Sequence, residues 1–151
     1  CHAQLCESKQ GGGLSFEEFI FAYVPVTLHF GWTTAAALVN WNGYISRCSL
    51  DLEWPIWVKV DALWVSLTLA GLLGTWITWR RMSALYALTV SWAVLAVASQ
   101  SATSRELREE FPGGQEALKK LTQVEYILGL ELVLVAVVSG GRRLKRMSSM
   151  A

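Results

Sequence analysis

Two ionisable side chains lie within long apolar stretches of the sequence, where neither water nor a charged neighbour is at hand. His29 falls in the uncharged stretch between Glu18 and Arg47, and Glu131 interrupts a run that is dense in Leu and Val. Ionisable groups inside a membrane are costly unless they meet a partner, and they usually mark functional positions. We therefore expect both side chains to contact a ligand or a polar partner.

The histidine has the most specific chemistry of the two. An imidazole nitrogen can bind the iron of haem or the magnesium of chlorophyll, and an open face of small residues leaves room for a flat ring. Alternatively, His29 hydrogen-bonds to a neighbouring helix, for instance to Gln100. No second histidine lies at a matching depth in the sequence, which argues against a bis-histidine haem.

Small and polar residues follow helical spacing in three of the apolar stretches. Such faces mark contacts with protein or ligand, because the hydrophobic effect does not drive helices together in lipid. We expect these faces to pack together with His29, Asn40 and Gln100 turned inward, and Trp32 either to stack on a pigment or to fill the core. The faces are Ala22, Pro25, His29, Thr33, Ala36 and Asn40; Ser66, Ala70 and Gly74; and Thr89, Ala93, Ala96 and Gln100.

The last apolar stretch has two different faces. Gly129, Ala136 and Gly140 share one side, while Glu131 points to nearly the opposite side. One face is expected to pack within the protein. The other requires a polar partner, the metal centre of a bound pigment, or another subunit.

Motifs of enzymes are missing from the sequence. It contains no nucleophile elbow, phosphate loop or Gly-rich dinucleotide fingerprint, so we expect no catalytic residues. Cys1, His2 and Cys6 form one short cluster without a second half, which predicts no metal site. The net charge of +1 gives no support for a nucleic-acid partner.

These candidate residues are positioned by helices that are long enough to cross a bilayer. The sequence predicts an all-α integral membrane bundle of four transmembrane helices with no sheet, preceded by a flexible tail over residues 1–15. The membrane domain is expected over 16–141 and a basic C-terminal tail over 142–151. The expected spans are 19–41, 60–79, 84–102 and 124–141.

The distribution of charges predicts the orientation of the bundle. With four spans, the N-terminal tail, the Arg80-Arg81 turn and the basic cluster after Gly141 share one side. Acidic residues such as Asp51 and Glu53 lie on the other. Positive-inside reasoning places both termini on the cytosolic or stromal side.

Two blocks of sequence resemble tryptophan-rich sensory proteins, which are relatives of the translocator protein family. The first runs from Val24-Pro-Val-Thr-Leu-His-Phe-Gly-Trp to Asn40, and the second from Arg80-Arg81 through Tyr86-Ala-Leu to Trp92. The resemblance covers residues 20 to 100. It carries over six motif residues with mostly structural roles: Pro25, Gly31, Trp32, Asn40, Tyr86 and Trp92. Translocator proteins have five spans and are associated with porphyrins, sterols and other hydrophobic ligands, so the resemblance implies ligand binding.

Two functions follow as expectations. The first is a non-catalytic accessory subunit of a membrane complex, specifically a photosystem assembly in a chloroplast thylakoid. Its partners would be other membrane subunits and the lipid bilayer, and it would bind chlorophyll, carotenoid, another tetrapyrrole or lipid around His29 and Glu131. The alternative is an independent sensor or transporter of porphyrins or other hydrophobic ligands, with a pocket among the first three spans.

Overall fold

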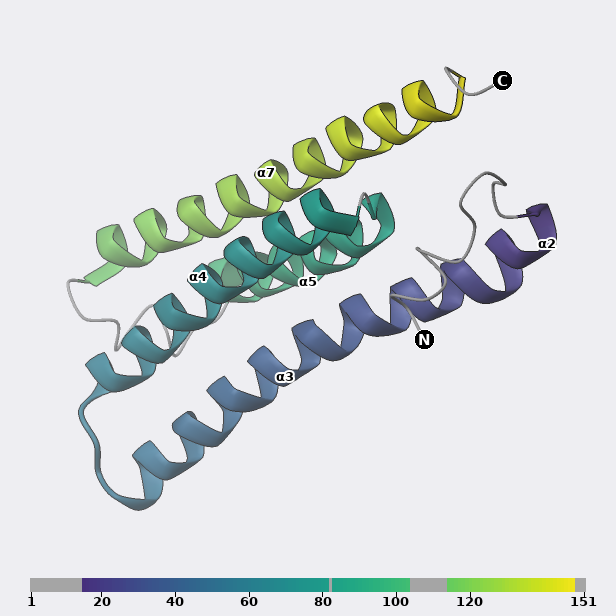
Figure 1. The fold of residues 1–151 in the computed structure, drawn as a ribbon. Coiled ribbons are helices and arrows are strands. Elements are labelled where there is room, and N and C mark those ends of the chain that lie inside the picture. Colours follow the sequence, from purple (N-terminus) through teal and green to yellow (C-terminus); the bar gives the residue numbers. More distant parts are fainter. Residues whose placement is uncertain (1–14, 82, 104–113, 149–151) are drawn as a thin grey trace.

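Four long antiparallel helices form the protein in a computed structural model that describes residues 15–81, 83–103 and 114–148 (Figure 1). The expectation for residues 1–15 falls almost entirely outside this part of the chain. No strand occurs in the described ranges, in agreement with the predicted all-α class. The helical elements are α2 (Phe16–Glu18), the π-helix η1 (Phe19–Tyr23), α3 (Val24–Asp51), α4 (Ile56–Arg81), α5 (Ala84–Thr103) and α7 (Gly114–Ser148).

The first helix is continuous from α2 through η1 into α3. Ser15 and Glu18 form a capping box, in which the Ser15 hydroxyl accepts from the Glu18 backbone N–H and the Glu18 carboxylate accepts from that of Ser15. Pro25 lies in the first turn of α3, directly after the π-helical turn. A proline has no backbone N–H to donate, and here a wider turn of the helix precedes it.

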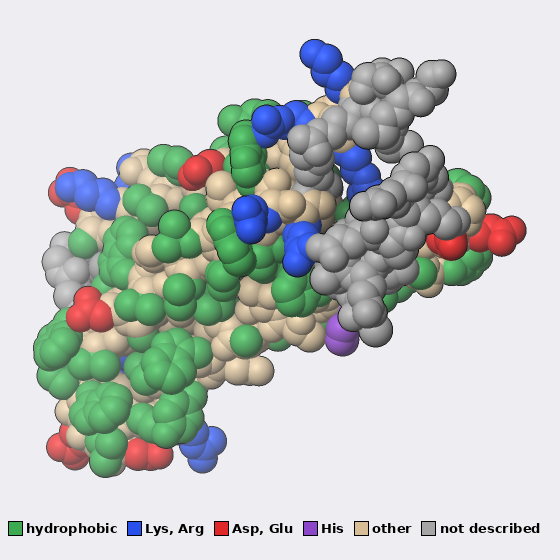
Figure 2. All heavy atoms as spheres, in the orientation of Figure 1, with side chains coloured by type: hydrophobic (Ala, Val, Ile, Leu, Met, Phe, Trp, Pro, Cys, Tyr) green, Lys and Arg blue, Asp and Glu red, His purple; other side chains and the backbone are tan. Residues whose placement is uncertain are grey.

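Basic side chains are concentrated at one end of the bundle, as expected (Figure 2). The α4–α5 turn, the start of α2 and the end of α7 lie together at one end, whereas the α3–α4 turn lies at the other (Figure 1). Lys and Arg side chains gather mostly around the end where α7 finishes (Figure 2). There the helix continues through the residues expected to form a basic tail and ends at Ser148.

The pattern of burial is that of a membrane protein. Small and weakly polar residues occupy the helix contacts, while large apolar side chains such as Leu72, Leu134 and Val137 are more than 60% exposed. Among the described residues, three helices are long and apolar enough to cross a bilayer, namely Ile56–Arg81, Ala84–Thr103 and Gln115–Arg143. The helix over the predicted span 19–41 is not one of the three. Exposed Trp57 and Trp79 lie about 33 Å apart along α4, which matches the distance between two membrane interfaces.

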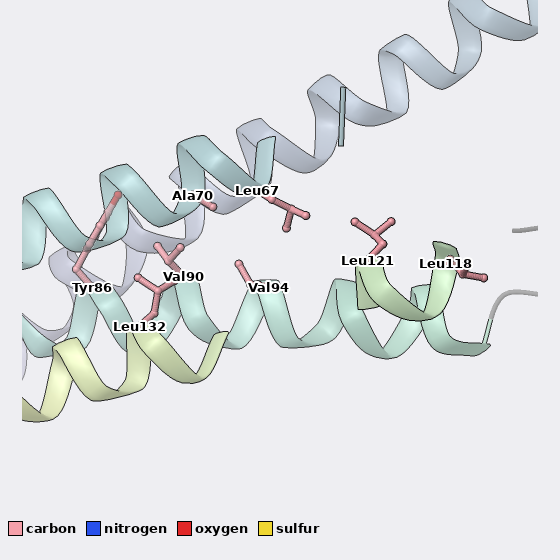
Figure 3. Close-up of a cluster of buried hydrophobic side chains, with 8 residues drawn as sticks. All are labelled: Leu67, Ala70, Tyr86, Val90, Val94, Leu118, Leu121 and Leu132. Atoms are coloured by element: carbon pink, nitrogen blue, oxygen red, sulfur yellow. The ribbon is translucent and has the colours of Figure 1, made fainter. Parts of the chain in front are cut away.

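A cluster of buried side chains lies where α4, α5 and α7 face one another (Figure 3). It comprises Leu67, Ala70, Tyr86, Val90, Val94, Leu118, Leu121 and Leu132. The most extensive contact in the bundle joins α5 and α7. Because lipid tails are as apolar as these side chains, their close packing rather than their removal from water stabilises the contact.

Hydrogen bonds between helices add to this packing. The Asn42 side-chain amide donates to the Ser66 hydroxyl at 2.6 Å, which joins α3 to α4. The Tyr86 hydroxyl donates to Thr34 at 3.2 Å, joining α5 to α3, and Ser91 donates to the Gly129 carbonyl of α7 at 2.7 Å. Such bonds each contribute about 0.6 kcal/mol on average in membranes.

Candidate ligand groove between α4 and α7

An open groove of about 790 Å³ runs along the outer side of the α4–α7 contact. Ligand pockets in proteins fall mostly between about 300 and 1,000 Å³, so the groove has room for a flat organic molecule. Its wall is largely apolar, with hydroxyl groups and one carboxylate among the lining residues. They are Trp64, Leu67, Thr68, Gly71, Leu72, Thr75, Trp76, Trp79, Val124, Ile127, Leu128 and Glu131.

The groove follows from the sequence of α4. Gly71 and Gly74 let α7 approach closely, because a Cβ at either position would lie within 2.8 Å of a Leu128 or Leu132 methyl carbon. Trp64 and Trp76 stand on the neighbouring face and project outward, with 40% and 60% of their surface exposed. The groove lies between this close helix contact and the projecting aromatic rings.

Glu131 is the carboxylate in this groove. It lies between Leu128 and Leu132 in sequence, and these residues contact α4 at Gly71 and Gly74, close to the middle of that helix. The side chain is exposed on the surface of the chain. At this depth lipid offers no hydrogen bond, so an exposed carboxyl group is costly without a polar partner.

One end of the groove reaches the basic end of the bundle. Trp79 lines the groove two residues before α4 ends at Arg81, and the Arg142 guanidinium carbon lies 4.2 Å from the centre of its ring. The neighbouring Arg143 stacks on Tyr23 instead, at 4.8 Å. The groove therefore combines a cationic rim with a carboxylate deeper in the membrane.

The five sequence-predicted site residues do not converge in one place. Glu131 lines the α4–α7 groove, Gln100 lies near the end of α5, and His29, Trp32 and Asn40 lie on α3. All five are exposed, so the prediction that His29, Asn40 and Gln100 turn inward is wrong. Ligand binding by these residues stays a prediction.

His29 and Asn40 are exposed because α3 turns a different face toward the bundle than the one predicted. The contact face carries Thr27, Gly31 and Ala35 rather than the stripe through His29 and Asn40. Gly31 is the residue that sets it, because only a glycine leaves room for the Thr89 side chain of α5. The expected stripe on α5 is half right, since Thr89 and Ala93 are half-buried but Ala96 and Gln100 are exposed. The expected stripe on α4, Ser66, Ala70 and Gly74, is buried as predicted.

The structure does not support the predicted pocket among the first three spans. The hollow bounded by α3, α4 and α5 measures about 50 Å³, too little for a tetrapyrrole. Trp32 and Trp92 do not fill this core either. The centroids of their rings lie 5.7 Å apart, and both side chains are at least half exposed.

A second carboxylate, Glu125, was not predicted from the sequence. It is fully buried between α5 and α7, where one oxygen accepts a hydrogen bond from Ser101 at 3.3 Å and the other, Oε2, has no partner among the described residues. The helical spacing of residues in α7 could have identified it as buried. Glu125 precedes Gly129, Ala136 and Gly140 on the face of α7 that was correctly expected to pack, and Glu131 lies on the opposite face, as predicted.

These features define a helical membrane protein with a lipid-facing groove. The sequence pattern of the TSPO-like protein family matches residues 2–138, and the chain belongs to that family. The match extends the resemblance seen over residues 20–100. No curated protein and no solved structure matches the chain.

Two of the six motif residues have the structural roles expected for them, and the other four are exposed on the surface of the chain. Gly31 makes the close contact with α5, and Tyr86 is completely buried. The described residues contain no group of His, Cys, Asp and Glu side chains arranged to hold a metal ion.

Proposed function

We propose that the protein is a non-catalytic, TSPO-like sensor or transporter that binds porphyrins or other flat hydrophobic molecules in the α4–α7 groove. Family membership favours this function over that of an accessory photosystem subunit, for which neither the family nor the groove supplies support. The observation that carries the proposal is the meeting of aromatic rings and one carboxylate in a groove at membrane depth.

The lining residues suit a planar ligand. Trp64 and Trp76 present large exposed rings that can stack on a macrocycle, and such aromatic contacts contribute about 0.5–1.5 kcal/mol each beyond the area they bury. Glu131 can accept a hydrogen bond from a pyrrole N–H, which lipid tails cannot offer. Thr68 already donates its hydroxyl to the Trp64 carbonyl, so its oxygen is free to accept.

Titration of the purified protein with protoporphyrin IX tests the proposal. In nanodiscs of electrically neutral lipid, we expect saturable binding at micromolar concentration, followed by the Soret absorbance after subtraction of empty nanodiscs. Trp76→Leu should weaken binding about fivefold, because one stacking surface is lost.

The matched control for this titration is Trp32→Leu. Trp32 is exposed to a similar degree but lies outside the groove, against Trp92. Its replacement should leave the affinity unchanged. Absence of saturable binding by the wild-type protein would refute the function, and an equal loss in both variants would refute the assignment to this groove.

A further inference from the structure

The groove has a basic residue at its rim and an acidic residue deeper in the membrane. Arg142 lies at its rim on the Trp79 ring, and Glu131 lies eleven residues earlier on the same helix, about 16 Å deeper. At the other limit of the groove, Trp64 stands eight residues inside α4. The groove therefore extends from the basic interface into the membrane without crossing it.

The guanidinium of Arg142, which lies over the Trp79 ring, is available to bind an anion. Stacking on an indole occupies the face of the planar guanidinium and leaves the N–H groups at its edge free to donate. Among the residues that the structure describes, no carboxylate forms an ion pair with Arg142, whose side chain is exposed. A carboxylate held at the end of a ligand in the groove would meet these donors in bidentate geometry.

Glu131 fixes the direction in which such a ligand lies. An anionic group placed at its depth would lie beside an acidic side chain in an apolar environment, and no cation among the described residues of the groove wall would offset its charge. The same anionic group placed beside Arg142 gains an opposite charge and reaches water at the interface. Only one of the two orientations is favourable.

We infer that the groove selects amphiphilic ligands with a free carboxylate at one edge, an inference that rests on the proposed function. Arg142 binds that carboxylate at the membrane surface, and the uncharged part of the ligand lies along Trp76 toward Glu131. Arg142 is thereby a specificity-determining residue, which distinguishes a free acid from its neutral ester.

The test compares protoporphyrin IX with its dimethyl ester, which has the same ring but no carboxylate. In neutral-lipid nanodiscs, with binding to empty nanodiscs subtracted, the wild-type protein should bind the free acid about tenfold more tightly. Arg142→Gln should remove this preference by weakening the free acid alone. Arg143→Gln is the matched control, because it removes the same charge from the adjacent position, where the arginine stacks on Tyr23.

Each outcome separates the inference from the proposed function. If neither compound binds, the proposed function fails. If both bind equally well, the function stands and selection by Arg142 is wrong. An equal loss of free-acid binding in the two arginine variants would also overturn the inference, since it would trace the preference to the general surface charge.

Discussion

Replacement of Gly31 by leucine should lower the free energy of unfolding by about 2 kcal/mol, the range found when side chains are forced into a packed contact. A Cβ at this position would lie 2.8 Å from the Thr89 Cβ. Thr89 cannot turn away easily, because its hydroxyl donates to the Leu85 carbonyl at 2.8 Å and its Cβ is fixed to the helix. The contact of α3 with α5 must therefore open.

Gly43→Leu is the matched control for this substitution. Gly43 is in the same helix, and a Cβ there would meet nothing within 4 Å. Leucine is a better helix former than glycine, so this variant should be about 0.5 kcal/mol more stable than the wild type. Unfolding in one detergent, followed by circular dichroism, measures both changes. Equal stabilities of the two variants would show that α3 does not pack on α5 through Gly31.

Replacement of the buried Glu125 by methionine should raise the free energy of unfolding by about 1–2 kcal/mol. Burial of a polar atom without a hydrogen bond costs about 1–3 kcal/mol, and Glu125 Oε2 lacks a partner among the described residues. Methionine has a similar volume and adapts its shape to the site. The Ser101 hydroxyl, which loses its acceptor, can bond instead to a carbonyl one turn earlier in its own helix.

Glu131→Met serves as the control, because the exposed carboxyl should contribute little to stability in detergent micelles. The same unfolding measurement applies to both variants. A loss of stability in Glu125→Met would mean that the buried carboxyl is satisfied by a group that the described residues do not include. A gain in stability together with a loss of porphyrin binding would instead mark Glu125 as a residue kept for function at a cost in stability.

Two of the carboxylates of α7, Glu125 and Glu131, show what helical periodicity can and cannot predict. The spacing of Gly129, Ala136 and Gly140 correctly predicts the face that packs, and it places Glu131 outside that face. The same periodicity places Glu125 inside it. Periodicity identifies the face on which a residue lies, but not the helix that covers it, so Ser101 could not be foreseen as the partner.

The α3 helix shows the opposite case. It offers two faces with small and polar residues, one through His29 and Asn40 and one through Thr27, Gly31 and Ala35. Their compositions are similar, so the sequence does not decide between them. The decision comes from shape, because Gly31 alone admits the Thr89 side chain of α5.

The helical class of the chain, the positions of three apolar helices and the concentration of basic residues at one end can all be predicted from the order of the amino acids. These properties depend on composition and on distances along one chain, and a bilayer imposes them on each helix separately. The faces through which the helices meet become known only from their packing. That packing places the groove between α4 and α7 and brings Trp76, Glu131 and Arg142 to it. Helix contacts in lipid depend on the fit of individual side chains, and that fit exists only once two helices are side by side.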